Sequence, residues 1–137
     1  MFYDDANRGV IQNRERARQI IDFSGLRYGN ITPTDIDGCI EYQDKGVAFI
    51  EIKHRDATMP KGQELALTRL VDNNSTAGKR AVLFVCEHDV DNCEMDITAS
   101  RTIVRDIYCN TKWVDGGGRT LKECMDIFIK WVDEKPF

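Results

Sequence analysis

Residues 34–53 read TDIDGCIEYQDKGVAFIEIK, and this stretch decides the fold. Two short runs, 37–42 and 47–53, flank the turn-forming residues 43–46. The first run alternates between apolar and polar side chains, whereas the second is mostly apolar. Both patterns are typical of β-strands, and the short polar connection between them predicts a β-hairpin.

Two acidic residues and a lysine belong to one end of this predicted hairpin. Asp37 opens the first strand, and Glu51 and Lys53 close the second. Because the end of the second strand lies beside the start of the first, we expect Asp37 next to Glu51. Strand side chains alternate between faces, so Glu51 and Lys53 point to the same face. Two carboxylates suit a hard cation such as Mg²⁺, and a neighbouring ammonium group offsets charge in phosphoryl transfer.

The order of these residues resembles a known signature. Asp37 followed by Glu51-Ile52-Lys53 resembles the D…(D/E)-x-K pattern of the PD-(D/E)XK nuclease superfamily. Gln63 follows Lys53 by ten residues in the first turn of a predicted helix, where several branches of that superfamily carry a glutamine. The motifs are short, and their order on a hairpin followed by a helix gives the resemblance its weight.

The resemblance covers residues 31–87 together with a predicted preceding helix. The Pro-Asp pair of the family is absent as such, because Pro33 is followed by Thr34 and Asp35. Asp35 is two positions from Asp37 on the same strand face and is the alternative for the same role.

The resemblance implies a metal-dependent nuclease, an endonuclease that hydrolyses phosphodiester bonds in duplex or branched DNA. It implies that Asp37 and Glu51 bind Mg²⁺, with Mn²⁺ as a substitute and the Ile52 carbonyl as a further ligand. It assigns Lys53 to position or activate the attacking water, and Gln63 to orient that water. A homodimer and a phage origin also follow from the resemblance to small resolvase-like members.

Other residues are further candidates for the site. Glu15 lies in a helix predicted over 10–23, where the superfamily often has an extra metal ligand; a surface ion pair with neighbouring arginines is the alternative. His88 follows a predicted buried strand, as either a catalytic or a hydrogen-bonding residue. Three basic residues are candidates for nucleic-acid contacts or for a solvated surface: His54, Arg55 and Lys61.

The rest of the chain completes an α/β pattern. Further helices are predicted over 60–72 and 121–132, and further strands over 81–86, 97–98, 102–104, 107–108 and 113–114. Gly25 is the expected cap of the first helix, and Thr120 and Glu123 form a capping box for the last. We therefore predict a restriction-endonuclease-like α-β-β-α-β core with a central mixed sheet, followed by extra strands and a C-terminal helix.

Composition limits the alternatives. The 137 residues predict a single domain over 1–137, and 42% hydrophobic and 31% charged residues are typical of a soluble globular protein. No apolar run has the length of a membrane span, and the first residues show no export signal, so we expect a cytoplasmic protein without membrane contact. Five cysteines without a CxxC pair indicate a reduced chain, and their spacing matches no structural zinc site.

The net charge of −4 counts against strong sequence-independent binding of nucleic acid. One alternative function is therefore a catalytically inactive binding module of the same fold, which holds nucleic acid or a protein partner, for example as an anti-defence protein. Another is a small-molecule phosphohydrolase, which needs a closed pocket where a nuclease needs an open basic groove. The sequence leaves open DNA against RNA, and endonuclease against exonuclease.

Overall fold

The computed structural model describes residue 15 and residues 18–134. The chain divides into two units, Met1–Pro33 and Thr34–Phe137. The elements of the second unit are β1 (Gly38–Tyr42), β2 (Gly46–His54), α2 (Lys61–Thr76), β3 (Arg80–His88), the short 3-10 helix η2 (Ala99–Arg101), β4 (Ile103–Cys109), β5 (Lys112–Asp115) and α3 (Leu121–Asp133). The predicted α/β class is thus confirmed.

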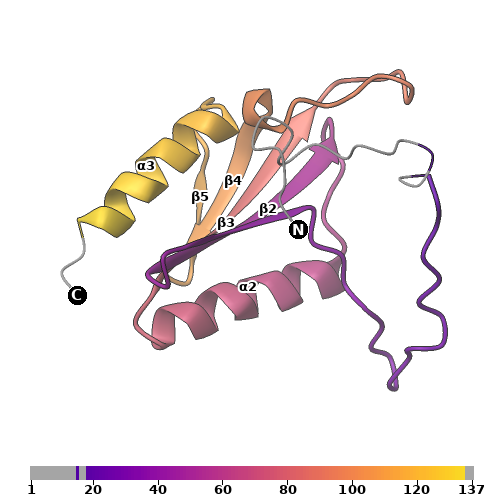
Figure 1. The fold of residues 1–137 in the computed structure, drawn as a ribbon, viewed down its shortest axis with the longest axis horizontal. Helices are drawn as coiled ribbons and strands as arrows, with labels where there is room; N and C mark the ends of the chain where they lie inside the picture. Colours follow the sequence, from indigo (N-terminus) through magenta and orange to yellow (C-terminus); the bar gives the residue numbers. More distant parts are fainter. Residues whose placement is uncertain (1–14, 16–17, 135–137) are drawn as a thin grey trace, which may run out of the picture. The chain divides into compact units, whose positions relative to one another are not determined.

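The second unit is a five-stranded mixed sheet in the order β1-β2-β3-β4-β5. Only the central β2–β3 pair is parallel, and the other neighbouring pairs are antiparallel. α2 connects the two parallel strands, and α2 and α3 lie on opposite faces of the sheet (Figure 1). The predicted central mixed sheet is confirmed.

The predicted hairpin is formed by β1 and β2. Gly38 pairs with Ile50 and Tyr42 with Gly46. Gln43 and Asp44 both have positive φ, 53° and 60°, as the type I′ turns that match strand twist require. The register places the residue before Gly38 opposite the residue after Ile50, which brings Asp37 to Glu51.

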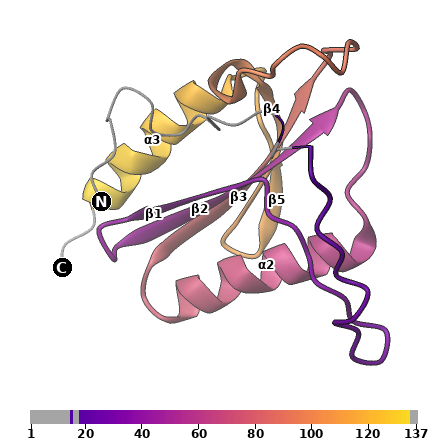
Figure 2. The same cartoon turned by 45° about the vertical axis from the view of Figure 1, so that its right-hand side comes forward.

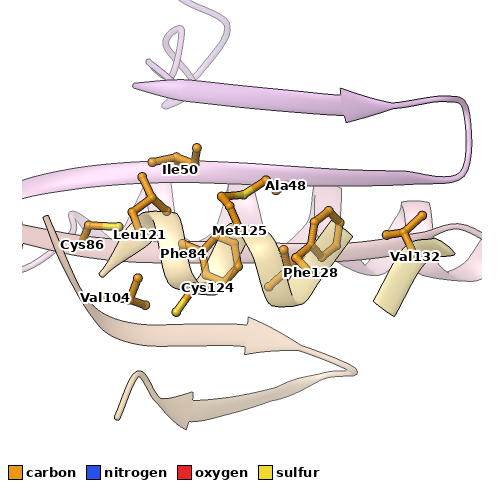
Figure 3. Close-up of a cluster of buried hydrophobic side chains, with 11 residues drawn as sticks. Ala48, Ile50, Phe84, Cys86, Val104, Leu121, Cys124, Met125, Phe128 and Val132 are labelled. Atoms are coloured by element: carbon orange, nitrogen blue, oxygen red, sulfur yellow. The ribbon is translucent and has the colours of Figure 1, made fainter. Parts of the chain in front are cut away.

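Side-chain alternation along the central strands gives the sheet two apolar faces. Against α3 lie Ala48, Ile50, Val82, Phe84, Cys86 and Val104, packed on Leu121, Cys124, Met125, Phe128 and Val132 (Figure 3). Against α2 lie Val47, Phe49, Ala81, Leu83, Val85 and Tyr108, packed on Leu67 and Val71. The capping box predicted for α3 is present, with Thr120 and Glu123 bonded to each other's backbone N–H groups.

Two glycines allow close packing around α3. A Cβ on Gly46 would lie 2.6 Å from Val132 Cγ2, at the end of α3. A Cβ on Gly116 would lie 1.8 Å from the Val104 carbonyl oxygen, which is backbone and has little room to move. Gly116 is therefore a position where the fold excludes any other residue.

The helix predicted over 10–23 is wrong over residues 19–23, which are irregular, while 10–14 and 16–17 lie outside the described residues. Ile20 and Ile21 are 93% and 73% exposed, so its expected apolar face buries nothing there. Because helices depend on packing of such a face, the pattern alone does not make one. Gly25 lies in a turn closed by the Leu26 N–H and Phe23 carbonyl and does not cap a helix.

The strand predicted over 97–98 is also wrong. Residues 89–98 form an irregular connection before η2, exposed over 91–98, and Ile97 remains 43% exposed. The segments predicted over 102–104 and 107–108 form the single strand β4, which carries an irregularity opposite Val85 and Cys86. α2 continues beyond its predicted end, to Thr76, and in its last turns the Asn74 side-chain amide donates to the Leu70 carbonyl.

No helix among the described residues combines the length and apolar character needed to cross a membrane.

Candidate active site

The four side chains predicted to be catalytic meet on the α2 face of the sheet. Glu51 and Lys53 lie on β2 and alternate with residues that face α3, and Asp37 immediately precedes β1. Gln63 lies in the first turn of α2. Figure 2 shows α2 along this face, with its first turn joined to the end of β2 by one loop. The parallel crossover therefore brings Gln63 back to the strand that carries Glu51.

The two carboxylates are joined through backbone amides. The Asp37 N–H donates to Glu51 Oε1 at 3.1 Å, and the Ile52 N–H donates to Asp37 Oδ2 at 2.7 Å. Each acid is thus oriented by the strand that carries the other. These two hydrogen bonds extend the β1–β2 pairing by one residue pair, with side-chain carboxylates as acceptors in place of backbone carbonyls.

Gln63 connects the carboxylate to the lysine. Its Nε2 donates to Glu51 Oε2 at 2.8 Å and to the Asp35 carbonyl at 3.2 Å. Its Oε1 accepts from Lys53 Nζ at 3.1 Å, and Lys53 Nζ lies 3.5 Å from Glu51 Oε2. Gln63 thus contacts both the Lys53 amine and the Glu51 carboxylate.

Glu51 is the only charged side chain buried among the described residues, at 1% exposure. Burial raises the pKa of Glu51, and the nearby Asp37 carboxylate raises it further. The hydrogen bond from the Asp37 N–H and the charge of Lys53 oppose this shift. Placing a buried acid beside a second acid costs stability, and the charge of Lys53 offsets only part of that cost. Such arrangements of perturbed carboxylates are typical of functional sites.

The donor set fits a hard divalent cation. Asp37 and Glu51 supply adjacent carboxylate oxygens, and a cation between them would offset their repulsion. Among the described residues no group of three or more His, Cys, Asp and Glu is placed to hold a metal. Two carboxylates suit an ion that keeps several waters and takes few protein ligands, as Mg²⁺ does. The Ile52 carbonyl as a further ligand stays a prediction.

The alternative acids differ in how they relate to this site. Asp35 contacts Gln63 through its backbone carbonyl, and its exposed carboxylate has no contact in the network. Glu15 is exposed and belongs to the first unit, so its role as an extra ligand stays a prediction. Asp37 is thus the acid that the geometry favours.

His88 lies at the end of β3, paired in register with His54. Its Nδ1 accepts from the Val90 N–H at 3.1 Å, and its ring centroid lies 5.1 Å from that of His54. These contacts fit the hydrogen-bonding role considered for His88. Lys61, a predicted nucleic-acid contact, is exposed at the first residue of α2.

The other two predicted nucleic-acid contacts, His54 and Arg55, share one acidic partner. Both side chains bind the carboxylate of Asp91 in the connection after β3. Arg105 donates to the Arg55 and Ala57 carbonyls at 3.3 and 3.1 Å, which fixes the start of the loop between β2 and α2. The sequence did not predict a role for Asp91, since no local pattern links it to His54 and Arg55, which lie 37 and 36 positions earlier.

An open hollow of about 330 Å³ lies beside the first turn of α2. Its lining comprises Thr58, Met59, Glu64, Val85, Arg105, Asp106 and Trp113. Val85 is the register partner of Glu51, so the hollow adjoins the site. Trp113 in this lining is 41% exposed, whereas Tyr108, its register partner on β4, is buried and bonded to Asp72.

No family model, curated protein or solved structure matches the chain.

Proposed function

We propose that this protein is a metal-dependent nuclease that hydrolyses phosphodiester bonds in DNA. One observation carries the proposal: the buried Glu51 carboxylate lies in contact with Asp37, Lys53 and Gln63. These are the four residues that the resemblance to the PD-(D/E)XK superfamily selects. The β1-β2-α2-β3 order with a parallel β2–β3 pair supports a restriction-endonuclease-like arrangement of the core.

Asp37 and Glu51 would hold Mg²⁺ or Mn²⁺. When bound, such an ion polarises a phosphoryl oxygen and lowers the pKa of a bound water. The protein's part is to fix the two carboxylates, and it does so through the Asp37 and Ile52 amides. We assign the Ile52 carbonyl as a third ligand on the resemblance alone.

Lys53 would position the attacking water or offset charge on the phosphate. An ammonium group has three N–H donors, and Lys53 directs its Nζ to Gln63 Oε1 and toward Glu51 Oε2. One donor remains for a water molecule or a phosphate oxygen. The Lys53 side chain is 19% exposed, so it is accessible from solvent while its position is constrained.

Gln63 would act mainly by orienting its two neighbours. The Gln63 side-chain amide accepts from Lys53 and donates to Glu51. In the opposite amide orientation its NH₂ group would face the Lys53 ammonium group, and its oxygen would face the Glu51 carboxylate. The network therefore fixes which atom of Gln63 faces each charge. An orienting residue of this kind raises the rate by reducing misaligned states of the catalytic groups.

We further propose duplex or branched DNA as the substrate, cut internally, with a homodimer as the form that cuts both strands. The open hollow next to Glu51 fits a polymer better than a small molecule that must be enclosed. These points extend the resemblance, and cleavage of a panel of substrates tests the choice of DNA and the internal cutting.

The alternative function is a binding module of the same fold that does not cut. The net charge of −4 favours it, as does the pairing of Arg55 and His54 with the Asp91 carboxylate. Such a module would hold nucleic acid or a protein partner, for example a host defence nuclease.

The test is cleavage of supercoiled plasmid, linear duplex, single strand, four-way junction and RNA in Mg²⁺, Mn²⁺ or EDTA. Wild type is compared with Glu51→Ala and Lys53→Ala, and with Lys122→Ala on α3 as a control. We expect metal-dependent cutting that the first two substitutions abolish and the control retains. No cutting of any substrate, or cutting that survives both substitutions, would refute the nuclease and favour the binding module.

A further inference from the structure

Two basic residues at the end of β2, His54 and Arg55, both bind the carboxylate of Asp91. Arg55 Nε and Nη2 lie 3.2 and 2.5 Å from the two carboxylate oxygens of Asp91. His54 Nε2 lies 2.8 Å from Asp91 Oδ1. Arg55 and then His54 hold the pKa of the Asp91 carboxyl below its ordinary value. The fork geometry is the one by which arginine binds either a carboxylate or a phosphate.

The backbone fixes the two basic residues independently of Asp91. Arg55 has a φ of 52°, an uncommon left-handed value for an arginine. Its N–H donates to the His88 carbonyl at 2.7 Å, and Arg105 donates to its carbonyl. The backbone of Arg55 is therefore fixed at the ends of β2 and β3, whichever anion its side chain binds.

The carboxylate that fills the fork is held weakly. The side chains of His54, Arg55 and Asp91 are 48%, 55% and 63% exposed. Residues 91–98 of the connection are all exposed. Exposed ion pairs contribute little to stability, so another anion can take the place of Asp91 at small cost.

We propose that His54 and Arg55 form a binding site for a backbone phosphate of nucleic acid, which Asp91 occupies in the free protein and a bound strand displaces. The inference rests on the proposed function for its ligand class. His54 follows Lys53 directly, so the bound phosphate lies at the same end of β2 as the catalytic residues. An open hollow of about 450 Å³, lined by Arg55, Asp56, Glu87, His88, Asp89 and Ile103, adjoins the fork.

The site also accounts for how an acidic protein binds a polyanion. Asp91 competes with any incoming anion for Arg55 and His54, and its displacement frees their N–H donors for a phosphate. Removing Asp91 should therefore strengthen the binding of nucleic acid, whereas removing a single acid elsewhere on the surface should not.

The test measures binding of a labelled DNA duplex and of a labelled four-way junction by anisotropy, with EDTA present to prevent cutting. Asp91→Asn keeps the shape of the side chain and Asp91→Ala removes it. We expect both to raise the affinity about 3- to 10-fold at fixed salt. Asp126→Asn is the matched control, because Asp126 forms an exposed ion pair with Lys122 on α3.

Arg55→Ala should weaken binding about 10-fold and lower the slope of log affinity against log salt by about 0.9, the value for one lost phosphate contact. Arg69→Ala, on the exposed side of α2, should leave the slope unchanged. Thermal unfolding of each variant verifies that it is folded.

The inference is overturned if Asp91→Asn and Arg55→Ala behave like their controls, or if no variant binds either DNA. If the two variants behave like their controls while wild type cuts DNA, the nuclease proposal is unaffected. Conversely, if both substitutions shift the affinity as expected while no substrate is cut in Mg²⁺ or Mn²⁺, the phosphate site stands and the nuclease proposal fails.

Discussion

Gln63 Nε2 donates a hydrogen bond to Glu51 Oε2 at 2.8 Å, which joins the first turn of α2 to the buried acid of β2. The same amide accepts from Lys53 Nζ, so one neutral side chain fixes an acid and a base together. Its effect on activity should therefore be through orientation, and it should differ in size from that of either charged neighbour.

Gln63→Ala should lower the rate of DNA cleavage about 10- to 100-fold, because Glu51 and Lys53 remain but lose their alignment. Lys53→Ala should lower it further, since the ammonium group itself is removed. Single-turnover cleavage of the preferred substrate measures both. Arg69→Ala, also on α2, should cut like wild type. A Gln63→Ala protein that is folded and cuts at the wild-type rate would contradict the orienting role.

The pH dependence of stability should report the burial of Glu51. Since burial raises the pKa of Glu51 above its ordinary 4.5, the folded metal-free protein favours the protonated carboxyl. This contribution is fully present below pH 4.5 and is lost as the pH rises through the higher pKa of the folded state. The unfolding free energy of wild type minus that of Glu51→Gln should therefore fall as the pH rises from about 4 to 7.

Urea unfolding without metal, at several pH values, measures this difference. Glu134→Gln is the control, since Glu134 is exposed after α3, and the corresponding difference should be flat. A difference that grows with pH would mean that the folded state prefers Glu51 ionised, contrary to the account.

Two glycine substitutions should change stability in opposite directions. Gly116→Ala places a Cβ against the Val104 carbonyl and should destabilise the protein by about 3 kcal/mol or more. Gly62→Ala, in the first turn of α2, meets no atom within 4 Å and should stabilise it by about 0.5–1 kcal/mol. Urea unfolding at pH 7 compares them, and equal effects would show that the loop at Gly116 is packed differently.

Local sequence patterns predicted much of the sheet and the centre of the site. The hairpin, β3 and α3 follow from alternation, an apolar run and a capping box, which are signals within a few residues. The meeting of Glu51, Lys53 and Gln63 also followed, because strand alternation and the helix after β2 determine it. The position of these three residues depends only on the hairpin and on the crossover helix α2 that follows β2.

What failed depends on contacts that sequence spacing does not contain. The pattern over 10–23 is amphipathic, but Ile20 and Ile21 remain exposed, so periodicity predicted a helix where the structure has none over 19–23. Asp91 binds Arg55 across 36 positions, and nothing near either residue indicates the pair.

Binding of a divalent cation by Asp37 and Glu51 can be measured by titration of the protein with Mn²⁺, followed by the electron paramagnetic resonance of free Mn²⁺. We expect saturable binding to wild type that both Asp37→Asn and Glu51→Gln weaken at least about tenfold, with Glu134→Gln unchanged. Wild type without saturable binding, or equal binding by all four proteins, would contradict binding of the cation by Asp37 and Glu51.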